Sequence, residues 1–219
     1  MKTPVIVLLF SLLSCCGNLF AAPPAGKEMC IVVLGDSLTA GYGLAMPTAF
    51  PARLQAALQR RGQQLRVVNA GISGDTSMGG LARLDWALAD RPDLMIVALG
   101  ANDALRGLDP AQTRQNINSI LSRLQKNGVK ALLAGMKAPR NLGEDYYTRF
   151  DRIYPQLARQ HNVPFYPFFL DGVAGNPGLN QTDGIHPTAA GVEIMVQGIL
   201  PLVEETLARI VETAGECAD

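Results

Sequence analysis

Short apolar segments alternate with longer segments of helical periodicity along most of this chain. The short segments are rich in β-branched residues and lack strict polar–apolar alternation, which favours strands buried on both faces of a parallel sheet. They lie at residues 31–34, 65–68, 94–99, 131–134 and 163–168. Such a chain predicts the α/β class, with about five parallel strands.

The segments between the strands predict helices. They include residues 47–61, 109–128 and 187–210. In the second of these, Asp109 can cap the first turn and Pro110 suits the first helical position. In the last, Pro201 interrupts the pattern, and we expect a kink there. Helices on both faces of the sheet would give a three-layer α/β/α sandwich of the flavodoxin-like type.

Length and composition indicate one globular domain. The chain has 219 residues, of which 48% are hydrophobic and 17% charged, so it can bury a sizeable core. The 19 lysine and arginine residues are balanced by 19 aspartate and glutamate residues. Because basic residues are not in excess, the sequence does not indicate the clustered positive charge that binding of DNA or RNA requires, and we expect no nucleic-acid partner.

The N-terminus has the pattern of a secretory signal peptide. Lys2 precedes an apolar run at residues 5–13, and small residues follow at Ala21 and Ala22. We therefore expect residues 1–21 to be removed and residues 22–219 to form a single periplasmic or secreted domain. The alternative is lipoprotein processing, with cleavage before a lipidated Cys15. If cleavage follows Ala21, Cys30 and Cys217 remain, either as two isolated thiols or as a disulfide.

Residues suited to chemistry follow four of the five predicted strands. Ligands of open parallel sheets bind beyond the carboxyl ends of the strands. The segments there read Gly-Asp-Ser at 35–37, a glycine-rich loop at 69–77, Gly-Ala-Asn-Asp at 100–103 and Asp-Gly-Ile-His-Pro at 183–187. Acyl transfer by serine needs a nucleophile, oxyanion donors, a base and a group that orients the base. These segments supply that set.

The same four segments resemble those of the SGNH (GDSL) hydrolase superfamily, most closely its bacterial thioesterase I, lysophospholipase and arylesterase branch. The stretches that carry the closer match are 35–43, 72–77, 81–84 and 183–187. The resemblance implies that Ser37 is the nucleophile, His186 the general base and Asp183 its orienting carboxylate. It also implies an oxyanion hole made by the backbone N–H groups of Ser37 and Gly74 and the side-chain amide of Asn102. The chemistry of the family requires no cofactor and no metal.

One position departs from the family pattern. Many members of this branch have Gly-Gly-Asn-Asp where this chain has Gly100-Ala101-Asn102-Asp103. If the second glycine of that pattern needs a positive φ, Ala101 would strain the loop that carries Asn102.

Simpler interpretations exist for several of these residues. Ser37 could be only a helix N-cap, and Asn102 could be only a turn former. A metal site of Asp36, Asp183 and His186 lacks any pair of histidines or cysteines at ligand spacing. The second histidine, His161, is expected at the C-terminus of a helix, interacting with that helix end and not with substrate.

Apolar residues lie in loops that are expected to rim the site. They are Met78, Leu105, Leu108, Met136, Pro139 and Leu142. They could line a groove for an acyl chain, or they could only pack the loops onto the sheet. The resemblance favours acyl esters and thioesters as small-molecule substrates, including lipids at a membrane, for a monomeric enzyme. The alternatives are an acetyl esterase acting on carbohydrate and a non-catalytic binding lipoprotein on the same fold.

Overall fold

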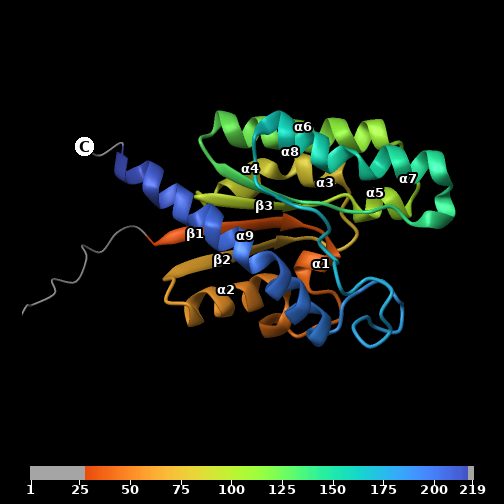
Figure 1. Ribbon diagram of the computed structural model, residues 1–219, viewed down its shortest axis with the longest axis horizontal. Coiled ribbons are helices and arrows are strands. Elements are labelled where there is room, and N and C mark those ends of the chain that lie inside the picture. Colours follow the sequence, from red (N-terminus) through yellow and green to blue (C-terminus); the bar gives the residue numbers. More distant parts are fainter. Residues whose placement is uncertain (1–27, 217–219) are drawn as a thin grey trace, which may run out of the picture.

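The computed structural model describes residues 28–216 and contains one sheet of five parallel strands (Figure 1). Its strands are β1 (Met29–Gly35), β2 (Leu65–Gly71), β3 (Leu94–Ala98), β4 (Lys130–Ala134) and β5 (Phe165–Tyr166). Their order across the sheet is β2-β1-β3-β4-β5, and every neighbouring pair is parallel. The expectation of about five parallel strands is confirmed.

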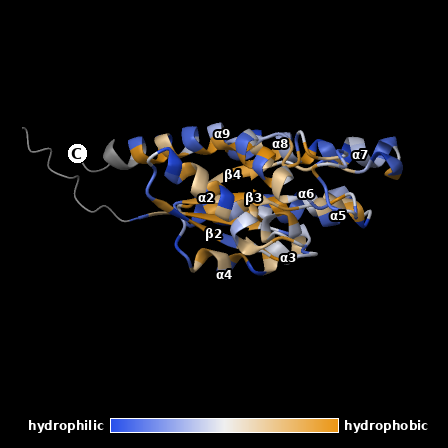
Figure 2. Ribbon diagram, turned by 90° about the horizontal axis from the view of Figure 1, so that it is seen from below, coloured by the Kyte–Doolittle hydropathy of each residue, from blue (hydrophilic) through white to orange (hydrophobic). Residues whose placement is uncertain are grey.

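The helices lie on both sides of the sheet. They are α1 (Ser37–Ala40), α2 (Phe50–Arg60), α3 (Ser77–Ala82), α4 (Leu84–Leu88), α5 (Ala101–Leu105), α6 (Pro110–Lys126), α7 (Glu144–Asp151), α8 (Ile153–His161) and α9 (Ala189–Glu216), with short 3-10 turns η1 (Met46–Thr48) and η2 (Arg140–Leu142). Figure 2 shows α9 on one side of the strands and α3 and α4 on the other. Helix α2 packs against α9, and α6 packs against α3 and α8. The three-layer α/β/α sandwich is therefore confirmed.

The core is centred on two interior strands of the sheet, β1 and β3. All four side chains from Ile31 to Leu34 are completely buried, as are those from Leu94 to Ala98. This explains why the apolar runs showed no alternation, since both faces of each strand are covered by helices. Helix α6 contributes its apolar face, with Ile117, Ile120 and Leu124 fully buried.

Three element boundaries differ from the sequence-based expectation. The fifth strand has only two residues, because Pro164 and Pro167 flank it and proline has no N–H to donate to a ladder. The predicted helix at 47–61 is divided at Ala49, whose backbone is extended, into η1 and α2. The last helix contains Pro201 within one continuous helix, which begins at Ala189 and extends beyond residue 210.

Some predictions fall outside the described residues. The predicted signal peptide, the alternative lipidation at Cys15 and a bond between Cys30 and Cys217 all involve segments 1–27 or 217–219. Within residues 28–216, no helix combines the length and apolar character needed to cross a membrane.

Candidate active site

Ser37 lies at a sharp turn where the interior strand β1 is followed by helix α1. The side chain of Asp36 caps this helix by accepting the backbone N–H of Leu38 at 3.0 Å. The turn is so tight that a Cβ on Gly35 would lie 2.0 Å from Thr39 Oγ1. The capping residue is therefore Asp36 and not Ser37, so the Ser37 hydroxyl is not used as a cap.

The Ser37 hydroxyl is linked to His186 and Asp183 by a chain of hydrogen bonds. His186 Nε2 lies 2.9 Å from Ser37 Oγ, and His186 Nδ1 lies 2.7 Å from Asp183 Oδ2. Asp183 Oδ1 also accepts the backbone N–H groups of Ile185 and His186, each at 3.0 Å. The hydrogen bonds from the backbone and ring of His186 lower the pKa of Asp183 to about 2. The ionised carboxylate makes Nδ1 the donor, which leaves Nε2 free to accept from Ser37.

The turn that carries His186 is supported by Gln181 and Tyr42. Gln181 Nε2 donates to the carbonyl oxygens of Tyr42 at 2.7 Å and of Pro187 at 2.9 Å, and the backbone N–H of Gln181 donates to the carbonyl of His186. The Tyr42 ring lies 4.5 Å from the His186 ring, centroid to centroid. Tyr42 belongs to the stretch that carried the family resemblance, but neither residue was predicted to support the turn, because both contacts depend on the tertiary fold.

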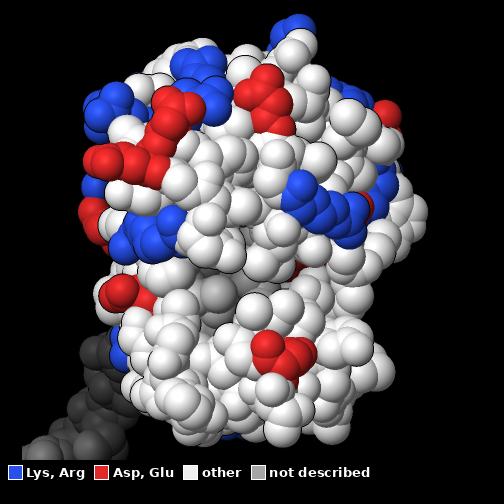
Figure 3. Space-filling view, turned by 90° about the vertical axis from the view of Figure 1, so that its right-hand side faces the viewer, with Lys and Arg blue, Asp and Glu red and all other residues white. Residues whose placement is uncertain are grey.

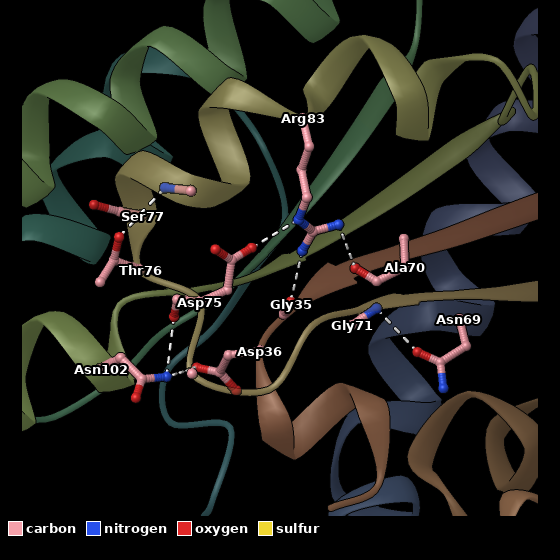
Figure 4. A network of polar contacts seen from close by, with 12 residues as sticks. Gly35, Asp36, Asn69, Ala70, Gly71, Asp75, Thr76, Ser77, Arg83 and Asn102 are labelled. Carbon is pink, nitrogen blue, oxygen red and sulfur yellow. Dashed lines mark hydrogen bonds and ion pairs between the residues drawn. The ribbon is translucent and has the colours of Figure 1, made fainter.

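Asn102 lies in the first turn of α5, directly after β3. Its Nδ2 donates to the carbonyl oxygen of Asp75 at 3.0 Å, which brings Asn102 beside the loop that contains Gly74 (Figure 4). Gly74 has a φ of +82°, and its carbonyl accepts from Arg106 Nη2 at 2.7 Å. Two of the predicted oxyanion donors, Gly74 and Asn102, therefore belong to segments in direct contact.

Ala101 introduces no backbone strain. Within the described residues, Arg91 and Asn162 are the non-glycine residues with positive φ, and in the Gly-Ala pair it is Gly100 that has a φ of +112°. A Cβ on Gly100 would lie 2.0 Å from the hydroxyl of Tyr154, which donates to the carbonyl of Leu99. Glycine is required at the first position of this pair, and alanine is tolerated at the second.

The residue after Asn102 anchors α5 to two other helices. Asp103 is 2% exposed, and its carboxylate accepts the backbone N–H and the hydroxyl of Ser77 and the hydroxyl of Thr113. Ser77 in turn accepts a hydrogen bond from Asn116. Asn102 is thus positioned by a buried network on one side and by the Asp75 carbonyl on the other.

Asp36 is a completely buried carboxyl group next to Ser37. Burial raises the pKa of this carboxyl group to about 6. Asn102 Nδ2 lies 3.5 Å from Asp36 Oδ2, at the outer limit of a hydrogen bond. The hydrogen bonds of the His186 ring go to Asp183 and Ser37, so Asp36 braces the turn and stands outside the Ser37–His186–Asp183 chain.

A cavity of about 660 Å³ opens beside Ser37 and His186. Figure 3 shows the corresponding end of the molecule hollowed by a groove with mainly uncharged walls. Among the predicted apolar residues, Leu105, Met136 and Pro139 line the cavity; Met78, Leu108 and Leu142 do not. Further lining residues, which were not predicted from the sequence, include Tyr42, Ala138, Phe168, Leu170 and Ile185.

The remaining candidates lie apart from this cavity. His161 ends helix α8 as expected, but its Nε2 lies 2.8 Å from Asn118 Oδ1 of α6 and it does not line the cavity. Helix α3 is capped by Thr76, whose side chain accepts from the backbone N–H of Gly79, while Asp75 pairs with Arg83. In the part of the chain that the structure describes, no three His, Cys, Asp or Glu side chains are grouped as metal ligands would be.

Comparison with known proteins identifies the family. Residues 33–194 match the model of the GDSL-like Lipase/Acylhydrolase family. The chain is 42% identical to esterase TesA of Pseudomonas aeruginosa over 197 residues, which cover 90% of this chain and 98% of that protein. It is 44% identical to thioesterase 1/protease 1/lysophospholipase L1 of Escherichia coli K12 over 158 residues, 72% of this chain and 74% of that protein. A crystal structure of TesA, 43% identical, aligns with a TM-score of 0.77 over 81% of this chain and 99% of that one. The chain belongs to the GDSL-like lipase/acylhydrolase family and is a hydrolase of ester bonds of the SGNH type.

Proposed function

We propose that this enzyme hydrolyses acyl esters and thioesters through a covalent intermediate on Ser37. The observation that carries the proposal is the unbroken chain from Ser37 Oγ through His186 to Asp183, with separations of 2.9 and 2.7 Å. Both separations are within hydrogen-bond reach, as a nucleophile, its general base and an orienting carboxylate require.

The first half-reaction forms the acyl-enzyme. Ser37 Oγ attacks the carbonyl carbon of the substrate while His186 Nε2 takes the hydroxyl proton. The ionised Asp183 stabilises the imidazolium that results, and its low pKa keeps it charged at neutral pH. His186 then gives the proton to the leaving alcohol or thiol. In the second half-reaction, water attacks the acyl-enzyme carbonyl while His186 takes a proton from the water. The acyl–Oγ bond then breaks, the carboxylic acid leaves, and His186 returns the proton to Ser37 Oγ.

The oxyanion of each tetrahedral intermediate would be bound by three donors. These are the backbone N–H groups of Ser37 and Gly74 and the Asn102 amide. Ser37, Gly74 and Asn102 all line the same cavity as His186, which supports this assignment. Hydrogen-bond donors aimed at a developing negative charge are commonly the largest single contribution to catalysis of acyl transfer.

The substrate class is proposed from the cavity and from the relatives. Leu105, Met136 and Phe168 give the cavity an apolar wall suited to an acyl chain. The relatives are named as an esterase and as a thioesterase and lysophospholipase. We propose fatty acyl esters, including lipid esters at a membrane, as substrates of a monomeric enzyme.

The test is the initial rate of hydrolysis of p-nitrophenyl esters from acetyl to palmitoyl, with Ser37→Ala as the matched blank. A Ser37-dependent rate that peaks at medium or long chains supports the proposal. A rate confined to the acetyl ester would favour the alternative of an acetyl esterase acting on carbohydrate. A rate that survives in Ser37→Ala would contradict the serine mechanism.

We also propose that the enzyme is exported and that its mature domain is residues 22–219. The support is the Lys2, apolar-run and Ala21-Ala22 pattern at the N-terminus. The intact mass of the protein, expressed full-length in a bacterial host, tests this. A mature chain that begins at Ala22 supports it, a lipidated chain that begins at Cys15 supports the lipoprotein alternative, and a chain that retains residues 1–21 contradicts export.

A further inference from the structure

A single guanidinium group joins three segments behind the nucleophile. Arg83, between α3 and α4, donates from Nε to Asp75 Oδ2 at 2.7 Å. Its Nη1 donates to the carbonyl oxygen of Ala70 and its Nη2 to that of Gly35, each at 2.8 Å (Figure 4). Ala70 and Gly35 lie at the carboxyl ends of β2 and β1. Arg83 thus ties two strand ends to the loop that contains Asp75.

The pair of Arg83 and Asp75 differs from an ordinary surface ion pair. Each of the two side chains is only 14% exposed, whereas most ion pairs of this protein have at least one partner more than a third exposed. The Asp75 carboxylate is also confined, because a Cβ on Gly79 would lie 1.8 Å from Asp75 Oδ1. The planar guanidinium makes three hydrogen bonds in fixed directions, which a lysine ammonium on a flexible stem does not reproduce.

Two of the three partners of Arg83, Gly35 and Asp75, lead to the proposed oxyanion donors. Gly35 is two residues before Ser37, whose backbone N–H is the first donor. Asp75 directly follows Gly74, whose N–H is the second donor. The carbonyl oxygen of Asp75 accepts from Asn102 Nδ2 at 3.0 Å, and that amide is the third donor. Arg83 itself does not line the cavity.

We propose that Arg83, acting with Asp75, is a positioning residue of the oxyanion hole. This inference rests on the function proposed above. Arg83 fixes the relative places of the Ser37, Gly74 and Asn102 donors without touching the substrate. Donors must lie about 2.7–3.1 Å from the oxyanion, and a misplacement of about 1 Å can cost about 100-fold in rate. Loss of Arg83 should therefore lower kcat and leave KM nearly unchanged.

The test compares Arg83→Gln with a matched control, Arg66→Gln. Arg66 also bonds a carboxylate and a backbone carbonyl, both of Asp90, but it lies near the start of β2, at the opposite end of the sheet. For Arg83→Gln we expect kcat to fall about 10- to 100-fold with KM within about threefold, measured well below the Tm of each variant. Arg66→Gln should retain kcat within about twofold. The pH–rate profile should keep its shape, because the link between His186 and Ser37 is not changed.

Two further variants keep the proposal falsifiable if Arg83→Gln does not fold. Arg83→Lys retains the charge next to Asp75 but not the three directed bonds, and Asp75→Asn removes the charged partner. Both variants should also lower kcat at nearly constant KM, but by less than Arg83→Gln does. Combining a folded Arg83 variant with Asn102→Ala should cost less than the product of the two separate losses, because both act on the same oxyanion.

The outcomes separate this inference from the proposed function. Two results would show that Arg83 is a structural residue only and that the inference is wrong. In the first, the Arg83 variants have a lower Tm but a kcat within about threefold of the unmodified enzyme. In the second, a lower kcat is accompanied by a comparable change in KM. Ser37→Ala is measured in the same experiment. If it abolishes activity while Arg83 variants remain fully active, the inference alone fails. If Ser37→Ala remains active, the proposed function fails as well.

Discussion

The proposed nucleophile, Ser37, and the proposed base, His186, define a nucleophile side and a base side of this site, and the two sides are held in place by different means. Ser37 and Asn102 follow strand ends, and their neighbours Asp36 and Asp103 are buried. Asn102 also donates to the carbonyl of Asp75, the partner of Arg83. His186 lies on a turn whose Asp183 side chain is 37% exposed. The first arrangement depends on the sheet and its covering helices, whereas the second is built largely within seven consecutive residues, 181–187.

The sequence separation between contacting residues shows the difference between the two sides most clearly. Arg83 reaches Gly35 across 48 positions of the sequence, and Asp103 reaches Ser77 across 26. Asp183 reaches the N–H groups of residues two and three positions away. Buried long-range networks give fixed positions, as oxyanion donors need. A local turn can supply and orient a base without such a network, so changes on the base side should lower the rate with little effect on stability.

The largest expected effect is that of Asp183→Asn on the base side. The amide oxygen can still accept the two backbone N–H groups, but it no longer holds the His186 tautomer that accepts from Ser37. We expect kcat to fall about 10⁴-fold. Because Asp183 is exposed, Tm should change by no more than about 2 °C. Kinetics and thermal unfolding of the same sample test both parts, and a large fall in Tm would break the contrast between the two sides.

Asn102→Ala should have the next largest effect. Removing one oxyanion donor typically lowers kcat by about 10²–10³ with little change in KM. The same variant also loses the hydrogen bond to the Asp75 carbonyl, so a measurable fall in Tm is expected on this side of the site. Steady-state kinetics with a medium-chain ester gives the result. A kcat within a few-fold of the unmodified enzyme would exclude Asn102 as a donor.

Asp36→Asn should change the pH dependence of stability. Burial raises the pKa of Asp36 from 3.8 to about 6 in the folded state. The folded protein therefore holds this proton more tightly than the unfolded chain does, and the resulting stabilisation is present below pH 3.8 and is lost as the pH rises through about 6. Between about pH 4 and pH 7, the free energy of unfolding of Asp36→Asn should rise by about 2–3 kcal/mol relative to the unmodified protein.

Urea unfolding at several pH values between those limits measures this difference. If the two proteins give parallel curves of unfolding free energy against pH, Asp36 does not carry a raised pKa. The nucleophile side would then lack the buried titrating carboxyl group that distinguishes it from the base side.

The smallest expected effect is that of Gln181→Ala. This change removes two hydrogen bonds of the Gln181 side chain. The bond to the carbonyl of Pro187 lies within the turn at residues 181–187, and the bond to the carbonyl of Tyr42 ties this turn to the loop after α1. We expect kcat to fall only a few-fold, with faster amide exchange in residues 181–187. The matched control is Gln160→Ala, which removes side-chain hydrogen bonds to Asn118 and Arg114 elsewhere on the surface. A loss as large as that of Asn102→Ala would mean that the turn is not self-contained.

The same contrast explains what could be predicted from sequence. The interior strands β1, β3 and β4 were predictable because burial on both faces leaves uninterrupted apolar runs, whereas the edge strands β2 and β5 are only partly buried. The Asp183–His186 pair was visible because its spacing is local. The roles of Arg83, Gln181 and Tyr42 were not predicted, since their partners are brought near only by the fold. Met78 was expected near the site from its loop, but it is 57% exposed and outside the cavity, because sequence position does not fix the direction of a loop side chain.

The most direct test that Ser37 and His186 form the reacting centre is reaction with a fluorophosphonate, followed by peptide mass mapping. We expect one adduct, on Ser37, that forms in step with loss of esterase activity and is absent from Ser37→Ala. In His186→Ala the adduct should form at least about 100-fold more slowly, because no base removes the hydroxyl proton. Complete inhibition with an unmodified Ser37, or an adduct that still forms in Ser37→Ala, would contradict the claim that Ser37 and His186 together form the reacting centre.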